Sequence, residues 1–250
     1  WKEAHVSPIF KKGDKTDCSN YRPISLLSCI GKVFEKCVQS RVFEYLSSNN
    51  ILTPYQSGFI PKDSTTYQLI CLYNDLCKSL DNNIPTQAVF FDISKAFDKV
   101  WHKGLISKLE AIGVRGRLLI WFQDYLSGRK QAVVLKGIKS IYLPVSAGVP
   151  QGSVLGPTLF LVYINDIVKN IESVIKLFAD DTSMYLSIEN PVLRADILNS
   201  DLSKIFEWAK KWKVLFNQTK TELLNLGRQQ NPDFIDLNFG DETLQDVEKH

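Results

Sequence analysis

Two adjacent carboxylates, Asp180 and Asp181, lie between two runs of residues that favour β-strands. The runs, residues 174–178 and 183–188, are rich in β-branched, aromatic and aliphatic side chains. Such runs separated by a few polar residues predict a hairpin, which puts both carboxylates at its tip. Like charges this close resist ionisation unless a cation neutralises them, and oxygen ligands suit a hard ion such as Mg²⁺. The same pair also fits an ordinary solvated turn.

A third carboxylate, Asp92, interrupts the apolar run of residues 88–93, which predicts a buried strand. A lone carboxylate in such a strand is costly unless it is paired or bound to a metal ion. The alternative is that Asp92 begins a turn together with Ser94.

The elements around these carboxylates predict how they meet. The strand with Asp92 is followed by an apolar helix over residues 158–170, the hairpin, an amphipathic helix opened by Asn190-Pro191, and a last strand over residues 222–226. This order indicates an α+β fold, a β-α-β-β-α-β-like sheet with helices on one face. Adjacent central strands would gather the three carboxylates, as two-metal phosphoryl transfer requires.

Upstream, the pattern predicts a strand over residues 4–10 and two helices. Ser28 is placed to cap the first helix, residues 30–46, with its apolar side chains at helical spacing facing inward. Ser64 or Thr65 begins the second, which runs through Leu80 with Leu69, Leu72, Tyr73 and Leu76 on one side. Residues 131–135 and 141–145 predict a second hairpin.

A glycine-rich stretch, residues 147–157, leads directly into the helix that begins near residue 158. Glycines permit close backbone approach and a helix N-terminus favours anions, although a plain strand-to-helix turn explains the glycines equally well. The stretch matches neither G-x-G-x-x-G nor G-x-x-x-x-G-K-[ST].

Charge and composition narrow the class of protein. The 250-residue chain has a net charge of +3 and is 44% hydrophobic, which fits a globular domain. Residues 101–140 hold eight basic and two acidic side chains, and Lys11, Lys12 and Lys15 form a second basic group. Such segments suit a polyanion, or else form an ordinary lysine-rich surface. No apolar run approaches the roughly 20 residues that span a bilayer. The five cysteines include no C-x-x-C pair, which favours reduced thiols in an intracellular compartment.

Several of these stretches together resemble the motifs of reverse transcriptases of non-LTR, LINE-type retrotransposons of the jockey and CR1 kind. Phe91-Asp92-Ile93-Ser94-Lys95-Ala96-Phe97-Asp98 is similar to motif A, residues 149–157 to motif B, Phe178-Ala179-Asp180-Asp181 to motif C, and residues 217–221 to motif D. Residues 20–27 and 56–59 resemble the upstream finger motifs. Each motif alone is weak, but this order and spacing are specific.

The resemblance implies a right-hand polymerase whose palm is a ferredoxin/RRM-like antiparallel sheet. It assigns residues 1–86 to the fingers, 87–102 to the palm, 103–146 to a fingers insertion, 147–227 to the palm, and 228–250 to a segment leading towards a missing thumb. The implied substrates and partners are an RNA template, a DNA primer and deoxynucleoside triphosphates, without a membrane. The cytoplasm and nucleus are the expected compartments.

The resemblance also implies roles for single residues. Asp92 and Asp180, with Asp181 beside them, would hold two Mg²⁺ ions, or Mn²⁺ in their place, and Lys220 would donate a proton to the leaving pyrophosphate. The nucleotide would meet Lys12 or a neighbouring lysine, Arg22, Gln151, Gly152 and Phe97, whose ring would exclude a 2′-hydroxyl. The template would lie near Gln56, Gly58 and Phe59.

Three alternatives stay open. The first is an RNA-dependent RNA polymerase, against which Phe97 and Ala179 argue. The second is a non-catalytic relic, against which the three intact carboxylates argue. The third is a group II intron maturase-like protein, which only downstream sequence would distinguish. We find no primer-grip motif after Leu226, no thumb and no endonuclease, so this chain can hold every catalytic carboxylate and still bind primer–template poorly or be inactive alone.

Overall fold

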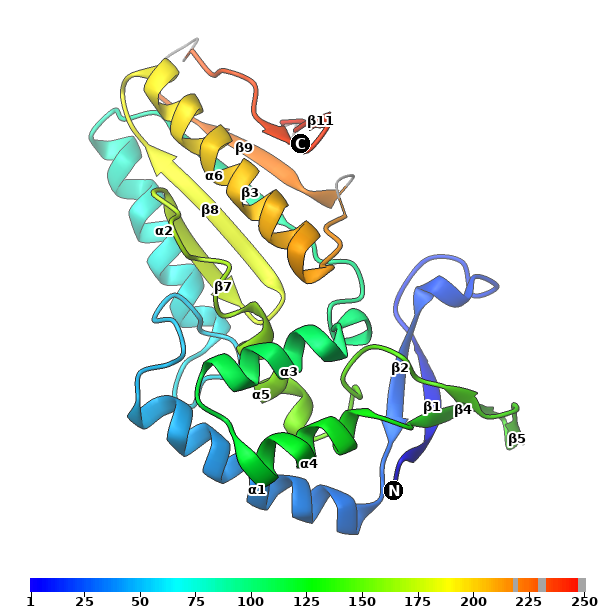
Figure 1. Cartoon of the computed structure of the whole chain (residues 1–250). Coiled ribbons are helices and arrows are strands. Elements are labelled where there is room, and N and C mark those ends of the chain that lie inside the picture. The colour runs from blue at the N-terminus through cyan, green and yellow to red at the C-terminus, as the bar shows by residue number, and fades with distance from the viewer. Residues whose placement is uncertain (218–219, 229–232, 247–250) are drawn as a thin grey trace. The chain divides into compact units, whose positions relative to one another are not determined.

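The computed structural model describes residues 1–217, 220–228 and 233–246, and the chain forms two compact units. Unit 1 combines Trp1–Leu52 with Lys95–Ile164, and unit 2 combines Thr53–Ser94 with Asn165–His250. Both units mix helices and strands, in agreement with the α+β prediction (Figure 1).

Unit 1 is built on a small sheet with the strand order β2-β1-β4-β5 and with β6 on β4. Strand β1 pairs with β2 antiparallel and with β4 in parallel. Four α-helices form the rest, and Leu105, Phe122 and Leu155 are fully buried. The elements are β1 (Glu3–Phe10), η1 (Cys18–Asn20), β2 (Tyr21–Leu26), α1 (Cys29–Ser48), η2 (Phe97–Lys99), α3 (His102–Ala111), α4 (Gly116–Leu126), β4 (Lys130–Leu135), β5 (Ile138–Lys139), β6 (Leu143–Pro144) and α5 (Leu155–Ile164).

Helix α1 begins after the predicted cap, because the Ser28 side chain accepts from the Gly31 amide. Its buried face agrees with the predicted one only in part: Val42 and Leu46 are buried, but Ile30 and Val33 are 84% and 67% exposed, and Gly31 and Glu35 are buried instead. The reason is Glu35, whose carboxylate accepts from the Tyr125 hydroxyl and from two backbone amides inside unit 1. A polar contact therefore fixes the rotation of this helix.

Unit 2 contains a four-stranded antiparallel sheet with the order β7-β8-β3-β9. This order confirms the prediction that the strand before Asp92 lies beside the hairpin. A helix covers the sheet, and Figure 1 shows α6 lying across β8 and β3. The elements are α2 (Thr65–Asp81), β3 (Thr86–Phe91), β7 (Val174–Phe178), β8 (Asp181–Ser187), α6 (Pro191–Trp212), β9 (Glu222–Leu226), β10 (Asn238–Phe239) and β11 (Glu242–Thr243).

The helix ends of unit 2 follow the capping signals in the sequence. The Asn190 side chain accepts from the Leu193 amide at 3.0 Å, and Pro191 occupies the first turn of α6. A cap of this type contributes about 1 kcal/mol. Helix α2 likewise begins after Ser64, whose hydroxyl accepts from the Tyr67 amide. Leu69 and Tyr73, expected on a packed side of α2, are 62% and 72% exposed.

Two buried charged side chains brace α6. Asp201 accepts from the Glu172 and Ser173 amides, the Ser173 hydroxyl and the Lys204 ammonium. Burial acts to raise the pKa of Asp201, but these hydrogen bonds outweigh it and lower the pKa below 3.8. Arg194 is fully buried and donates to the Gln87 side chain and to the carbonyls of Ile188 and Asp233. These contacts tie α6 to β3 and to the segment before β10.

The helix predicted over residues 158–170 is shorter in the structure. Helix α5 ends at Ile164, and turns follow as far as Asn170, whose φ of 61° lies in the left-handed region. Asn165, the first residue after the helix, belongs to unit 2, where its side chain accepts a hydrogen bond from the Thr53 amide. Among the helices of the described residues, none is both long and apolar enough to cross a membrane.

Candidate active site

The carboxylates of unit 2 meet at one end of its sheet. Strands β3 and β8 are antiparallel with Phe90 opposite Ser183 and Phe91 opposite Thr182, so Asp92, directly after β3, and Asp181, the first residue of β8, lie at the same end of the sheet. Asp180 lies in the turn between β7 and β8. The register thus gathers all three carboxylates predicted from the sequence.

The charges of this cluster act on one another. Burial raises the pKa of Asp181 above 3.8, and the nearby Asp180 and Asp92 carboxylates raise it further. On the other side of Asp92, the Lys220 ammonium lies 3.8 Å from Oδ2. Crowded carboxylates of this kind favour a bound cation, because it relieves their repulsion.

The donor chemistry of the cluster fits Mg²⁺, which prefers carboxylate oxygens and retained water. Burial raises the pKa of Asp181, and the charges of Asp180 and Asp92 add to that effect. As the side chains stand, however, no three or more His, Cys, Asp or Glu residues in the described part of the chain are arranged to hold a metal ion. The fit therefore rests on the donor set and its charge.

The turn that carries Asp180 is held from below by Gln56. The Gln56 Oε1 accepts from the Ala179 amide at 2.9 Å and from the Gly58 amide at 2.7 Å, and Nε2 donates to the Ala179 carbonyl at 3.5 Å. Ala179 has a φ of 57°, a left-handed conformation that costs a non-glycine residue roughly 1–2 kcal/mol. Gln56 is thus buried under the hairpin and stabilises its strained turn.

Gly58 and Phe59 follow Gln56 on the same loop. A Cβ atom at Gly58 would lie only 2.1 Å from the Ala179 nitrogen, so the close approach of the loop to the hairpin requires glycine. Phe59 is 51% exposed. Of the three residues expected near the template, Gln56 and Gly58 contact the hairpin tip, while Phe59 presents part of its ring to solvent.

Unit 1 holds the glycine-rich stretch, and its helix N-terminus is already engaged. The Glu35 carboxylate accepts from the Val154 amide at 2.7 Å and from the Leu155 amide at 3.3 Å, at the start of α5. The anion that the sequence suggested for this N-terminus is thus supplied by the chain itself. Gly152 has a different reason to be glycine, because a Cβ atom there would lie 2.6 Å from the Ser25 carbonyl oxygen.

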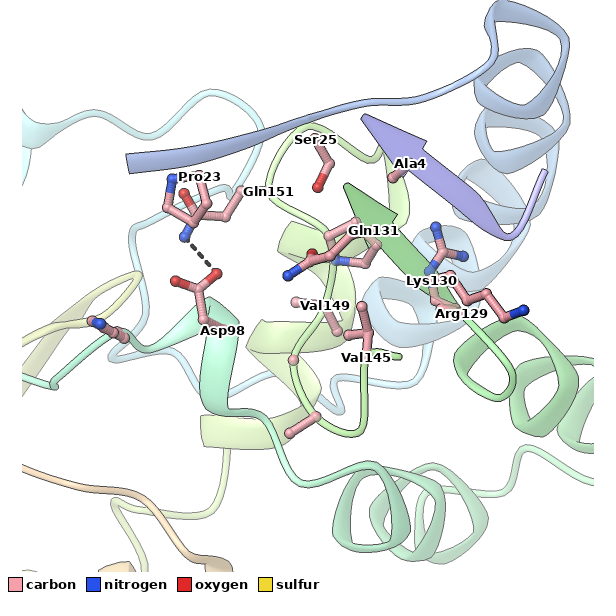
Figure 2. A pocket seen from close by; sticks show the side chains of 14 residues that line it. Ala4, Pro23, Ser25, Asp98, Arg129, Lys130, Gln131, Val145, Val149 and Gln151 are labelled. Atoms are coloured by element: carbon pink, nitrogen blue, oxygen red, sulfur yellow. Dashed lines mark hydrogen bonds between the residues drawn. The ribbon is translucent and has the colours of Figure 1, made fainter. Parts of the chain in front are cut away.

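A cavity of about 230 Å³ opens beside this stretch, within unit 1 (Figure 2). Gln151 lines it and donates from Nε2 to Asp98 Oδ1 at 2.8 Å. Three cationic side chains also line the cavity, namely Lys95, Arg129 and Lys130. Figure 2 shows Asp98 and Gln151 pointing towards each other at one end, with Arg129 and Lys130 at the other.

The other residues expected to bind the nucleotide do not line this cavity. Arg22 is exposed on β2, where strand alternation puts it on the opposite face from Pro23 and Ser25, which line the cavity. Lys12 is exposed after β1, and it is the charge of its neighbour Lys11 that acts on Asp98. Phe97 is half-buried and stacks on Phe160 of α5, with ring centroids 4.7 Å apart.

The motif D stretch is described only in part, because Gln218 and Thr219 lie outside the described residues. The Asn217 amide donates to the Asp92 carbonyl at 2.7 Å, and the Lys220 amide donates to the Asn217 carbonyl. This ties the start of the stretch to the backbone of Asp92. Residues 229–232 and 247–250 of the C-terminal segment likewise lie outside the described residues.

Two polar residues at these sites were not assigned a role from the sequence. Asp98 is the last residue of the stretch similar to motif A. Its position six residues after Asp92 is the one feature of the sequence that could have indicated a role in the site. No feature of the sequence indicates a role for Glu35, because the apolar spacing of its helix does not predict that this position is buried.

The basic segment of residues 101–140 divides into exposed and buried cations. Lys108 donates to the Tyr163 carbonyl inside unit 1, and Arg129 donates to the Tyr125 carbonyl while stacking on that ring. Both are buried. The six remaining cations are exposed: Lys103, Arg115, Arg117, Lys130, Lys136 and Lys139.

Comparisons with known proteins agree with this geometry. The family model described as reverse transcriptase (RNA-dependent DNA polymerase) matches residues 9–239. The RNA-directed DNA polymerase from the mobile element jockey of Drosophila melanogaster is 33% identical over 88% of this chain, and so is the probable RNA-directed DNA polymerase from its transposon X-element. The chain spans about a quarter of the length of each. The fold is similar to that of apo telomerase from Candida tropicalis truncated from its C-terminal domain, with a TM-score of 0.64 at 13% identity over 96% of this chain and 52% of the telomerase chain.

Proposed function

Since this chain belongs to the reverse transcriptase family, we propose that it adds deoxynucleotides to a primer 3′-hydroxyl along an RNA template. The proposal places it in the polymerase of a non-LTR retrotransposon, as in its jockey and X-element relatives. In this proposal residues 1–86 and 103–146 act as the fingers, and residues 87–102 and 147–227 act as the palm.

One observation carries the proposal: Asp92 and Asp181 lie at the same end of the β3–β8 strand pair, next to Asp180 in the turn. Phosphoryl transfer needs little covalent participation from the protein, so its catalysts chiefly position charge around the transferred group. Three carboxylates at the end of one sheet are suited to that task. Bound there, two Mg²⁺ ions would activate the primer hydroxyl and offset charge on the leaving pyrophosphate.

The chain's own residues take supporting roles in this proposal. Asp92, Asp180 and Asp181 hold the ions, and Mn²⁺ can replace Mg²⁺. The Lys220 ammonium, 3.8 Å from the Asp92 carboxylate, gives a proton to a pyrophosphate oxygen. Lys12 and Arg22 contact the triphosphate, and Gln151 and Gly152 line the nucleotide site. Phe97 excludes the 2′-hydroxyl by its bulk. Gly58 and Phe59 face the template, and Gln56 supports them from below.

The test replaces the carboxylates one at a time by their amides. Asp92→Asn and Asp180→Asn are expected to abolish nucleotide addition to a DNA primer on an RNA template at any substrate concentration, because the metal sites act on the transition state. Both should also weaken Mn²⁺ binding, measured by titration of the full chain without nucleic acid. Asp196→Asn is the matched control, since Asp196 is exposed on α6.

The two measurements separate the possible failures. Full activity in either amide variant, or Mn²⁺ affinity equal to that of Asp196→Asn, would overturn the assignment of the carboxylates. Mn²⁺ binding that depends on Asp92 and Asp180 supports the metal site even if the chain extends primers poorly.

A further inference from the structure

Two stretches of unit 1 that are distant in sequence form a continuous contact around Gln151. The Val149 amide donates to the Phe97 carbonyl and the Gly148 amide to the Val100 carbonyl, each at 2.8 Å. Between these backbone bonds, Gln151 Nε2 donates to Asp98 Oδ1 at 2.8 Å (Figure 2). The glycine-rich stretch thus pairs with the backbone around η2, and the Asp98 side chain adds a hydrogen bond to Gln151.

The hydrogen bond to Asp98 gives the Gln151 amide a direction. An ionised carboxylate only accepts hydrogen bonds, so the nitrogen end of the amide must face Asp98 and the oxygen end must face away. The backbone of Gln151 is fixed as well, because its carbonyl accepts from the Ser25 amide of β2 at 2.7 Å. Gln151 is therefore held at both its main chain and its side chain.

Asp98 differs from a surface carboxylate. It is partly buried and lines the cavity together with Gln151, Lys95 and Lys130. The pKa of Asp98 is raised above 3.8, because burial outweighs the opposing effects of the Gln151 hydrogen bond and of the charges of Lys95 and Lys11. A partly buried acceptor whose hydrogen-bonding partner is the Gln151 amide contributes more to orienting that amide than to solubility.

We propose that Asp98 is a positioning residue that fixes the orientation of the Gln151 amide, so that the Gln151 Oε1 and the remaining Nε2 proton face the incoming deoxynucleotide. This inference rests on the proposed function, in which Gln151 lines the nucleotide site. Asp98 itself does not touch the nucleotide. It removes the alternative amide rotamer, and so the nucleotide meets a side chain that is already ordered.

The kinetic test compares Asp98→Asn and Asp98→Ala with the parent chain. Asn keeps an accepting oxygen but also offers an NH₂ group, so we expect the order parent, Asn, Ala in affinity for deoxythymidine triphosphate. Loss of a hydrogen bond to a charged group corresponds to about ten-fold, and we expect that loss in KM with a smaller change in kcat. Glu110→Gln, an exposed neutralisation on α3, is the matched control.

Coupling to Gln151 distinguishes positioning from a general structural role. In a Gln151→Ala chain, Asp98→Ala should have little further effect on nucleotide affinity, whereas independent sites would add. A second readout needs no catalysis: the Gln151 side-chain NH₂ signals of a ¹⁵N-labelled chain should shift in Asp98→Ala but not in Glu110→Gln.

The outcomes are distinct. Additive effects of the two substitutions, or unshifted Gln151 signals in Asp98→Ala, would overturn the role of Asp98. If the parent chain does not bind the nucleotide while the Gln151 signals still shift in Asp98→Ala, the proposed nucleotide site is wrong. The claim that the Gln151 amide faces an incoming nucleotide would then be wrong as well.

Discussion

The support of the hairpin turn by Gln56 leads to a quantitative prediction for Gln56→Ala. Gln56 is only 6% exposed, and its Oε1 accepts from the Gly58 and Ala179 amides, which belong to buried residues. Removing the acceptor leaves two buried N–H groups, each of which costs about 1–3 kcal/mol when unsatisfied. Because water reaches some of the vacated space, we expect the free energy of unfolding to fall by about 2–4 kcal/mol.

Equilibrium urea denaturation measures this loss, and a second variant separates hydrogen bonding from volume. Gln56→Met fills the same space without an accepting oxygen, so it should lose at least half of the stability that Gln56→Ala loses. Gln123→Ala, on the exposed face of α4, should change stability by less than about 0.5 kcal/mol. Primer extension by Gln56→Met should fall as well, because Ala179 is then free to leave its left-handed conformation and to carry Asp180 with it.

The reasoning fails if Gln56→Met is as stable as the parent chain. That result would mean that the Ala179 turn forms without the amide, and that the buried contacts seen here are incidental. Normal stability combined with lost activity would instead point to a direct role of Gln56 in binding nucleic acid.

Three further predictions concern charge and substrate choice. Because the pKa of Asp181 is raised by burial and then by Asp180 and Asp92, its contribution to stability is fully present below pH 3.8 and is lost as the pH rises through the raised value. Asp181→Asn should therefore raise the melting temperature at pH 7 by at most about 2 °C, because Asp181 is exposed and solvent screens its repulsion from Asp180 and Asp92; a gain that does not shrink towards pH 3.8 would contradict this. Phe97→Ala should raise kcat/KM for ribonucleotides relative to deoxynucleotides, whereas a purely packing role, as in its stack on Phe160, predicts lost stability with an unchanged ratio. Affinity for an RNA–DNA duplex should fall steeply with salt, and the double variant Arg115→Gln/Arg117→Gln should flatten that slope more than Lys108→Gln, whose cation is buried; equal slopes would refute the electrostatic interpretation.

The strands and carboxylates around the site could be predicted because short runs of β-branched, aromatic and aliphatic residues are a local signal. The runs around Asp180 and Asp181 and the apolar run before Asp92 each indicate a strand, and their order in the chain predicts which strands pair. The Asn190-Pro191 start of α6 is equally local. Such features need no knowledge of distant contacts.

Features set by distant polar contacts could not be predicted. The rotation of α1 depends on Glu35 reaching the start of α5, 119 residues further along the chain. The use of Gln56 under the hairpin depends on a contact between residues 123 positions apart. In both cases the local sequence around the carboxylate or amide gives no information about which distant residue it contacts.

The interleaved chain of the two units has a consequence for synthesis. Strand β3 is central in its sheet, but its neighbours β8 and β9 lie about 90 and 130 residues further on. At about 5–20 residues per second, the ribosome leaves β3 without its first neighbour for roughly 5–20 s. During that interval Ala88-Val89-Phe90-Phe91 is an unpaired apolar strand, the kind of segment that pairs with other chains. The yield of folded protein is therefore set by how well this strand is shielded while the hairpin that carries Asp180 and Asp181 is still being made.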